Sequence, residues 1–149
     1  LITPHFAVEE FKCHDGTPYP VDRLELDGVT TWLQSRLIPL AETLEVLREA
    51  AGGRPLHVLS AYRPPAYNER VGSKATSQHP RGRASDVEHP TMTAAKLHRI
   101  ALGLYRTGHL PHLGGLGLYA SFVHLDVRPR PEDGHLAQWE GIRARAELG

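Results

Sequence analysis

The sequence predicts a small α+β fold, a single domain over residues 1–149, and three observations lead to this class. Leucines recur at three- and four-residue steps between Asp22 and Ala51, which is typical of a helix with one buried face. Apolar and polar residues alternate from Phe122 to Arg128, which is typical of a half-buried strand. Finally, a chain of 149 residues buries a sizeable core without covalent cross-links.

Composition narrows the classes of function. The 17 basic residues balance the 17 acidic ones, so no net field favours nucleic acid or an anionic membrane as a partner. No apolar run approaches the roughly 20 residues that span a bilayer, and we expect a monomer. No basic-then-apolar export signal is visible, although Leu1 is not an initiator methionine and leaves an earlier start open. Cys13 is the only cysteine, which excludes an intrachain disulfide and a thiolate zinc cage.

Residues 1–20 show little periodicity and are interpreted as an ordered, extended arm. We expect its aromatic side chains, Phe6 and Phe11, to pack into the core. The segment Cys13-His14-Asp15 invites a metal site, but a buried thiol beside an Asp-Gly turn explains it better, because no second cysteine completes a cage.

Residues 22–51 are expected to be helical, with a break or kink near Leu37 caused by Pro39 and a stop at Gly52-Gly53. The other predicted elements are a strand over 55–60, a short helix from Pro65 that closes at Gly72, a strand over 84–88, a helix from Thr91 or Thr93 to Gly108, a hairpin of 117–119 with 122–128, and a tail anchored by Trp139.

The stretch from Ser77 to Asp86 has the character of a metal site. His79 and Asp86 offer a nitrogen and an oxygen of the kind that zinc accepts. Pro80 and Gly82 bend the chain between them, so both side chains can reach one ion. His124 is the obvious third ligand, and two histidines with one carboxylate leave an open position, as in a catalytic zinc site.

Two further residues stand at positions suited to chemistry. Alternation along the 122–128 strand puts His124 and Asp126 side by side, on the face that does not enter the core. Arg63 stands where the 55–60 strand ends, a common place for a side chain that points into a cleft, although a solvated charge is the ordinary interpretation of any single arginine.

These residues resemble a known family, the zinc D-alanyl-D-alanine carboxypeptidases, which includes murein peptidases, phage endolysins and the hedgehog signalling domain. The resemblance is carried by Ser77-x-His79-x-x-Gly82-x-Ala84-x-Asp86, by the Phe-Val-His-x-Asp strand around His124, and by Ser60-Ala61-Tyr62-Arg63. It implies a mostly antiparallel sheet with helices on one side and Zn²⁺ in an open cleft. It also implies zinc ligation by His79, Asp86 and His124, and contacts to the substrate from Arg63 and Ser77.

By the same resemblance, the substrate is a peptide stem of bacterial peptidoglycan, and the protein is expected to be periplasmic, secreted or phage-associated. The chain departs from the family at the catalytic base. Many relatives carry a carboxylate three residues before the last ligand or a histidine two before it, where this chain has Ser121 and Phe122. Asp126, on the same strand face as His124, is the first candidate for the base, and Glu88 is the second.

Two other functions compete with peptide hydrolysis. A zinc-containing binding module of the same fold, without activity, would explain the missing base. A non-haem iron oxygenase could use two histidines and a carboxylate, here His124, Asp126 and His135. Such oxygenases usually need a double-sheet barrel, for which this chain offers too few strands.

Overall fold

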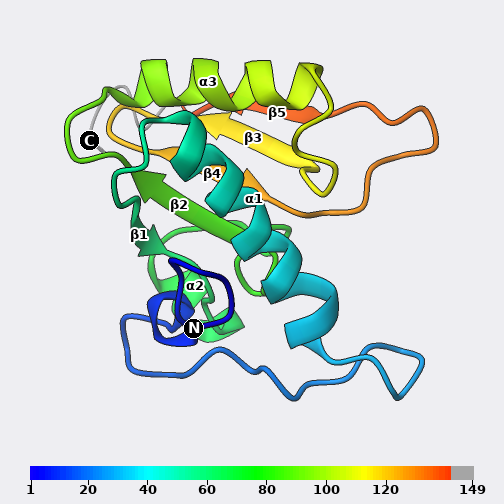
Figure 1. Cartoon of the computed structure of the whole chain (residues 1–149). Helices are drawn as coiled ribbons and strands as arrows, with labels where there is room; N and C mark the ends of the chain where they lie inside the picture. The colour runs from blue at the N-terminus through cyan, green and yellow to red at the C-terminus, as the bar shows by residue number, and fades with distance from the viewer. Residues whose placement is uncertain (142–149) are drawn as a thin grey trace.

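The computed structural model describes residues 1–141 and shows an α+β domain built on one five-stranded sheet (Figure 1). The strands are β1 (His57–Ser60), β2 (Ala84–Glu88), β3 (Gly115–Leu118), β4 (Val123–Asp126) and β5 (Ala137–Glu140). The helices are α1 (Ile38–Ala50), α2 (Pro65–Arg70) and α3 (Ala94–Arg106). The strand order is β1-β2-β4-β3-β5, antiparallel except between β3 and β5. The predicted fold class is confirmed.

The sheet has one apolar and one polar face. Because side chains alternate along a strand, Val87, Val123 and Leu125 share one face, where they are fully buried in the core. Helices α1 and α3 pack against each other over this core, and α3 contacts β3 and β4. Asp86 and His124 lie on the opposite face, directly across from each other in the register of β2 and β4. The helices therefore leave this second face free to form a site.

The expected helix over residues 22–51 begins later than predicted. Residues 22–31 form turns and an isolated antiparallel bridge between Leu24 and Thr31. The named helical segments begin at Leu33, first with a π-helical turn and then with α1. Asp27 explains the difference, because its carboxylate accepts the backbone N–H groups of Val29 and Thr30, each at 2.8 Å. Such side-chain bonds compete with helix formation.

Pro39 was expected to break or kink the helix near Leu37. It lies in the first turn of α1, and at Leu37 the winding changes from the π-helical turn to α1 without an interruption of the helix. Gly52 and Gly53 end α1 as expected, with φ angles of 98° and 75°. Within residues 1–141, no helix is both long and apolar enough to cross a membrane.

The N-terminal arm packs its aromatic side chains as predicted. Phe6 and Phe11 are buried and their ring centroids lie 6.3 Å apart. The arm is less extended than expected, because Val8–Phe11 forms a 3₁₀ turn. Cys13 is a buried free thiol, and Asp15 beside it closes the turn by accepting the Thr17 N–H at 2.9 Å.

The remaining predictions hold with shifted boundaries, apart from the tail. Thr93 is the residue that caps α3, and its hydroxyl accepts the Lys96 N–H at 3.2 Å. The hairpin forms between β3 and β4. The tail contains a strand that was not predicted, β5, which pairs parallel to β3 at the edge of the sheet. The last residues of the expected domain, 142–149, lie outside the part of the chain that the structure describes.

Candidate metal centre

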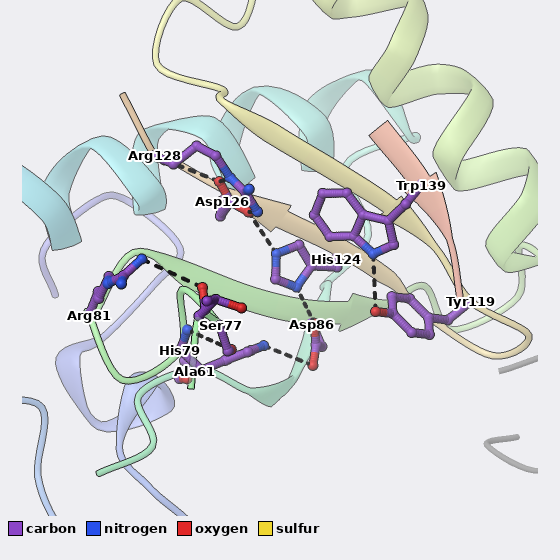
Figure 2. Close-up of polar contacts among 11 residues, drawn as sticks. Ala61, Ser77, His79, Arg81, Asp86, Tyr119, His124, Asp126, Arg128 and Trp139 are labelled. Carbon is purple, nitrogen blue, oxygen red and sulfur yellow. Dashed lines mark hydrogen bonds and ion pairs between the residues drawn. The ribbon is translucent and has the colours of Figure 1, made fainter. Parts of the chain in front are cut away.

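Three buried side chains converge on the polar face of the sheet (Figure 2). Asp86 comes from β2, His124 from β4 and His79 from the turn that precedes β2. The three residues each offer a ligand atom within 4.8 Å of the others. Among residues 1–141 this is the one group of histidine, cysteine and carboxylate side chains with such a geometry. The predicted ligand trio is thus brought together by the fold.

The turn that carries His79 depends on glycine. Gly82 has a φ of 67° and its N–H donates to the His79 carbonyl at 3.1 Å. A Cβ at this position would lie 2.6 Å from the Tyr19 hydroxyl and 2.8 Å from the Trp32 ring. Both the left-handed backbone and the close packing therefore require glycine. Ser77 also shapes this turn, because its hydroxyl accepts the His79 backbone N–H at 3.2 Å.

Hydrogen bonds fix which nitrogen of His79 faces the centre. Its Nδ1 lies 2.6 Å from the Ala61 carbonyl oxygen, which can only accept, so Nδ1 carries the proton. Nε2 is left as the free nitrogen and lies 3.3 Å from an oxygen of Asp86. Burial lowers the pKa of His79 despite the opposing charge of Asp86, which favours the neutral ring that metal ligation requires.

His124 is held at both of its nitrogens. Nδ1 lies 3.0 Å from Asp86, and Nε2 lies 2.8 Å from Asp126. Burial disfavours the charged ring, but the hydrogen bonds to Asp126 and Asp86 outweigh it and raise the pKa of His124 to about 9. Since Asp86 is shared with His79, Nδ1 is the nitrogen of His124 that points to the centre.

Asp126 is fully buried and saturated with donors. One oxygen accepts from the backbone N–H of Arg128 at 3.1 Å and from its Nε at 2.8 Å. The other oxygen bonds the Arg128 guanidinium at 2.6 Å and His124 at 2.8 Å. Burial raises the pKa of a carboxyl, but the bonds from Arg128 and His124 hold the pKa of Asp126 well below its usual range.

The donor set fits zinc. Two imidazole nitrogens and one carboxylate are common zinc ligands, and three protein ligands leave a position for water or substrate. Burial opposes ionisation of Asp86, but His79 and His124 keep its pKa well below the usual range, so it remains a carboxylate. The second nitrogens of His79 and His124 already have acceptors, Ala61 and Asp126, as is usual for metal-bound histidines.

Arg63 follows β1 and lies near the centre. Its backbone N–H donates to the His79 carbonyl at 3.4 Å. The Nε of its side chain is buried and has no hydrogen-bond partner among the described residues. Burial lowers the pKa of the guanidinium, and the charge of Asp86 opposes this shift. A buried arginine donor without a partner is suited to an incoming acceptor.

The other residues singled out in the sequence lie outside the trio. Glu88 ends β2, and its half-exposed carboxylate lies 3.2 Å from Nδ1 of His57. His135 is exposed and pairs with Asp133 at 2.6 Å. It therefore does not join His124 and Asp126 as the iron-site interpretation would need, and the single five-stranded sheet is not a double-sheet barrel.

Trp139 has a larger role than the sequence suggested. It was expected only to anchor the tail, but its ring lies beside His124, with centroids 5.1 Å apart (Figure 2). Its indole N–H donates to the Tyr119 hydroxyl at 3.1 Å. The short alternation of Ala137–Glu140 was the available signal, but nothing local indicated where this strand would pair.

Comparison with known protein families shows to which family the chain with these three candidate ligands belongs. The model of the family described as Peptidase M15 matches residues 4–126. The chain belongs to the peptidase M15 family. The match confirms the resemblance inferred from the sequence, and it includes His79, Asp86 and His124 within the matched residues. No curated protein matches the chain. Membership in this peptidase family and the buried His-Asp-His group agree on a metallopeptidase-like centre.

Proposed function

We propose that this M15 protein is a zinc peptidase that hydrolyses amide bonds in peptidoglycan stem peptides, as a D-Ala-D-Ala carboxypeptidase or a murein endopeptidase. The observation that carries the proposal is the buried trio of His79, Asp86 and His124, whose ligand atoms lie within 4.8 Å of one another. Family membership supports peptide hydrolysis. The peptidoglycan substrate and a periplasmic, secreted or phage-associated location rest on the sequence resemblance.

In the proposed mechanism the protein supplies a fixed set of ligands. Zinc at the centre would polarise the scissile carbonyl and lower the pKa of water towards about 7. His79 and His124 would hold the ion through Nε2 and Nδ1, because Ala61 and Asp126 occupy their other nitrogens. This preorganisation avoids the cost of orienting the rings when the ion or the substrate arrives.

Arg63 is proposed to bind the substrate. Its guanidinium offers a fixed fork of donors that suits a peptide carboxylate or the oxygen of the scissile carbonyl. The buried Nε without a partner supports this role. Ser77 was predicted to touch the substrate as well. Its contact with the His79 N–H is compatible with that role, because a hydroxyl that accepts a hydrogen bond can still donate one.

Asp126 is proposed to orient His124. Both of its oxygens are engaged by Arg128 and His124, and this bonding supports orientation over proton transfer, the alternative role expected from the sequence. Glu88 remains the second candidate for the base. Its partial exposure and single contact with His57 leave it available to accept a proton.

A binding module without activity is the second candidate function. Ser121 and Phe122 occupy the positions where many relatives carry the base, and this observation favours it. The two functions differ in one measurement, which is digestion of purified peptidoglycan with the products identified by mass.

The digestion compares wild-type protein with His79→Ala and with His112→Ala as a matched control. His112 is an exposed histidine that pairs with Glu42 on the surface, so its loss should not affect the centre. We expect peptide products from the wild type and His112→Ala and none from His79→Ala. Wild-type protein that binds zinc but releases no product would establish the binding module instead.

A further inference from the structure

Two aromatic rings flank the imidazole of His124. The His79 ring lies with its centroid at 5.2 Å and an interplanar angle of 75°, and the Trp139 indole lies at 5.1 Å and 54°. Figure 2 shows the indole on β5 and His79 on different sides of this ring. The contact with His79 belongs to the centre itself. The contact with Trp139 comes from a residue beyond the family match, which ends at 126.

A glycine in β3 leaves the space that this indole occupies. Gly117 of β3 is the register partner of His124 on one side and of Trp139 on the other. A Cβ at Gly117 would lie 2.6 Å from the indole Nε1, closer than side-chain carbons approach in folded proteins. Because Gly117 carries no side chain, Trp139 can reach across β3 to the ring of His124.

The indole is also fixed in place. Its Nε1 donates to the Tyr119 hydroxyl at 3.1 Å, and the Tyr119 ring in turn stacks on Phe122 with centroids 4.5 Å apart. The Arg128 guanidinium lies 5.1 Å from the indole centroid, a cation–π contact. Arg128 also binds Asp126, the acceptor of His124 Nε2. Arg128 thus contacts both Trp139 and Asp126, the two residues outside the ligand trio that lie against the His124 ring.

We propose that Trp139 is a positioning residue for the ligand His124, a role that rests on the function proposed above. Hydrogen bonds to Asp86 and Asp126 hold the two nitrogens of the imidazole, but both act at the edge of the ring and give no support to its faces. The indole packs against the ring, with centroids 5.1 Å apart, and so helps to keep Nδ1 directed at Asp86 and the zinc position. Strand β5 is then a working part of the centre.

The test measures zinc affinity by competition with a chromophoric chelator for purified variants of the whole protein. Trp139→Leu keeps apolar bulk on β5 without a flat ring, and we expect its zinc affinity to fall roughly 10–100-fold, as for other groups that support a ligand. Trp139→Phe restores an aromatic face and should bind zinc nearly as the wild type does. Gln138→Ala, an exposed neighbour on the same strand, is the matched control and should change nothing.

A spectroscopic readout accompanies the titration. Trp32 and Trp139 are the two tryptophans of the chain, so the difference between wild-type and Trp139→Phe emission reports on Trp139. We expect this difference to change when zinc is added, because the ion would bind the ring that lies 5.1 Å from the indole. Folded Trp139→Leu with wild-type zinc affinity would overturn the proposal. If Trp139→Leu does not fold, the emission measurement decides instead. A difference between wild-type and Trp139→Phe emission that does not change when zinc is added would then overturn the proposal. Wild-type protein that binds no zinc would instead refute the proposed function itself.

Discussion

Asp86 and His124 face each other across β2 and β4, with an Asp86 oxygen 3.0 Å from Nδ1 of His124. The two residues are 38 positions apart in the chain, and the register of two antiparallel strands makes them neighbours. His79 meets the same carboxylate at 3.3 Å from the preceding turn. A rigid sheet therefore supplies two of the three proposed zinc ligands, and the predictions below follow from this arrangement.

The first prediction concerns metal content. Protein purified without chelator should carry about one zinc per chain by elemental analysis, because the three ligands form a single site. His79→Ala should lose the metal, whereas alanine at His14, His89, His109 or His112 should retain it. Each of these four histidines has a partner elsewhere, for example His89 with the Ala51 carbonyl at 3.0 Å. Full zinc stoichiometry in His79→Ala would remove it from the ligand set.

Zinc should also stabilise the folded protein. A ligand that binds only the native state adds about 2.7 kcal/mol to the free energy of unfolding at 100 times its dissociation constant. The unfolding midpoint of the wild type should therefore rise with zinc and fall after treatment with a chelator. His79→Ala should show neither change, which separates specific binding from general effects of the ion.

A second prediction separates two roles for Asp126. If Asp126 orients His124, Asp126→Asn should weaken zinc binding by roughly 10–100-fold, and activity should recover in excess zinc. If it acts as the base, zinc affinity should be kept and turnover should fall, commonly 10²–10⁴-fold. The bonds from Arg128 and His124 lead us to expect the first result. If Asp126→Asn changes neither zinc affinity nor turnover, Glu88 becomes the candidate for the base.

A third prediction tests Arg63. Arg63→Lys keeps the charge but loses the planar fork of donors, so turnover should fall steeply while the melting temperature changes little. The reason is that the Arg63 Nε has no hydrogen-bond partner to lose among the described residues. A large drop in melting temperature with activity retained would mean that Arg63 stabilises the fold instead.

A fourth prediction concerns stability at low pH. The bidentate hydrogen bonds from Arg36 to Glu25, at 2.6 and 2.7 Å, hold the pKa of Glu25 at about 2, against an ordinary value of 4.5. A lowered pKa means that this pair stabilises the fold fully above about pH 4.5 and loses its effect as pH falls from 4.5 towards 2.

Glu25→Gln should therefore unfold more easily than the wild type at pH 6, and the difference should shrink as the pH approaches 2. Denaturant unfolding at several pH values measures this difference directly. Glu42→Gln is the control, since Glu42 is exposed and lies 3.5 Å from His112 on the surface. An equal penalty for Glu25→Gln at every pH would show that the carboxylate charge is not what stabilises this region.

The sequence by itself determined the candidate ligand residues and the fold class. His79 and Asp86 are close in the chain and separated by a turn that Gly82 imposes, so their convergence is a local property. Alternation along β4 places His124 and Asp126 on one face for the same reason. The predicted start of the helix was wrong at residues 22–31, which precede the leucine repeat and in which Leu26 and Val29 are exposed on a turn held by Asp27.

Only the tertiary structure decided how the centre is supported. The Ala61 carbonyl decides which nitrogen His79 directs to the centre, and the Asp126 carboxylate decides it for His124. The contact between His79 and Ala61 is not predictable from the spacing of residues in the sequence. The partner of Asp126 is Arg128, and the ring that covers His124 is Trp139, delivered by a parallel strand at the sheet edge. Strand pairing joins residues by register across long stretches of chain, and a short strand carries little local signal of the neighbour it will find.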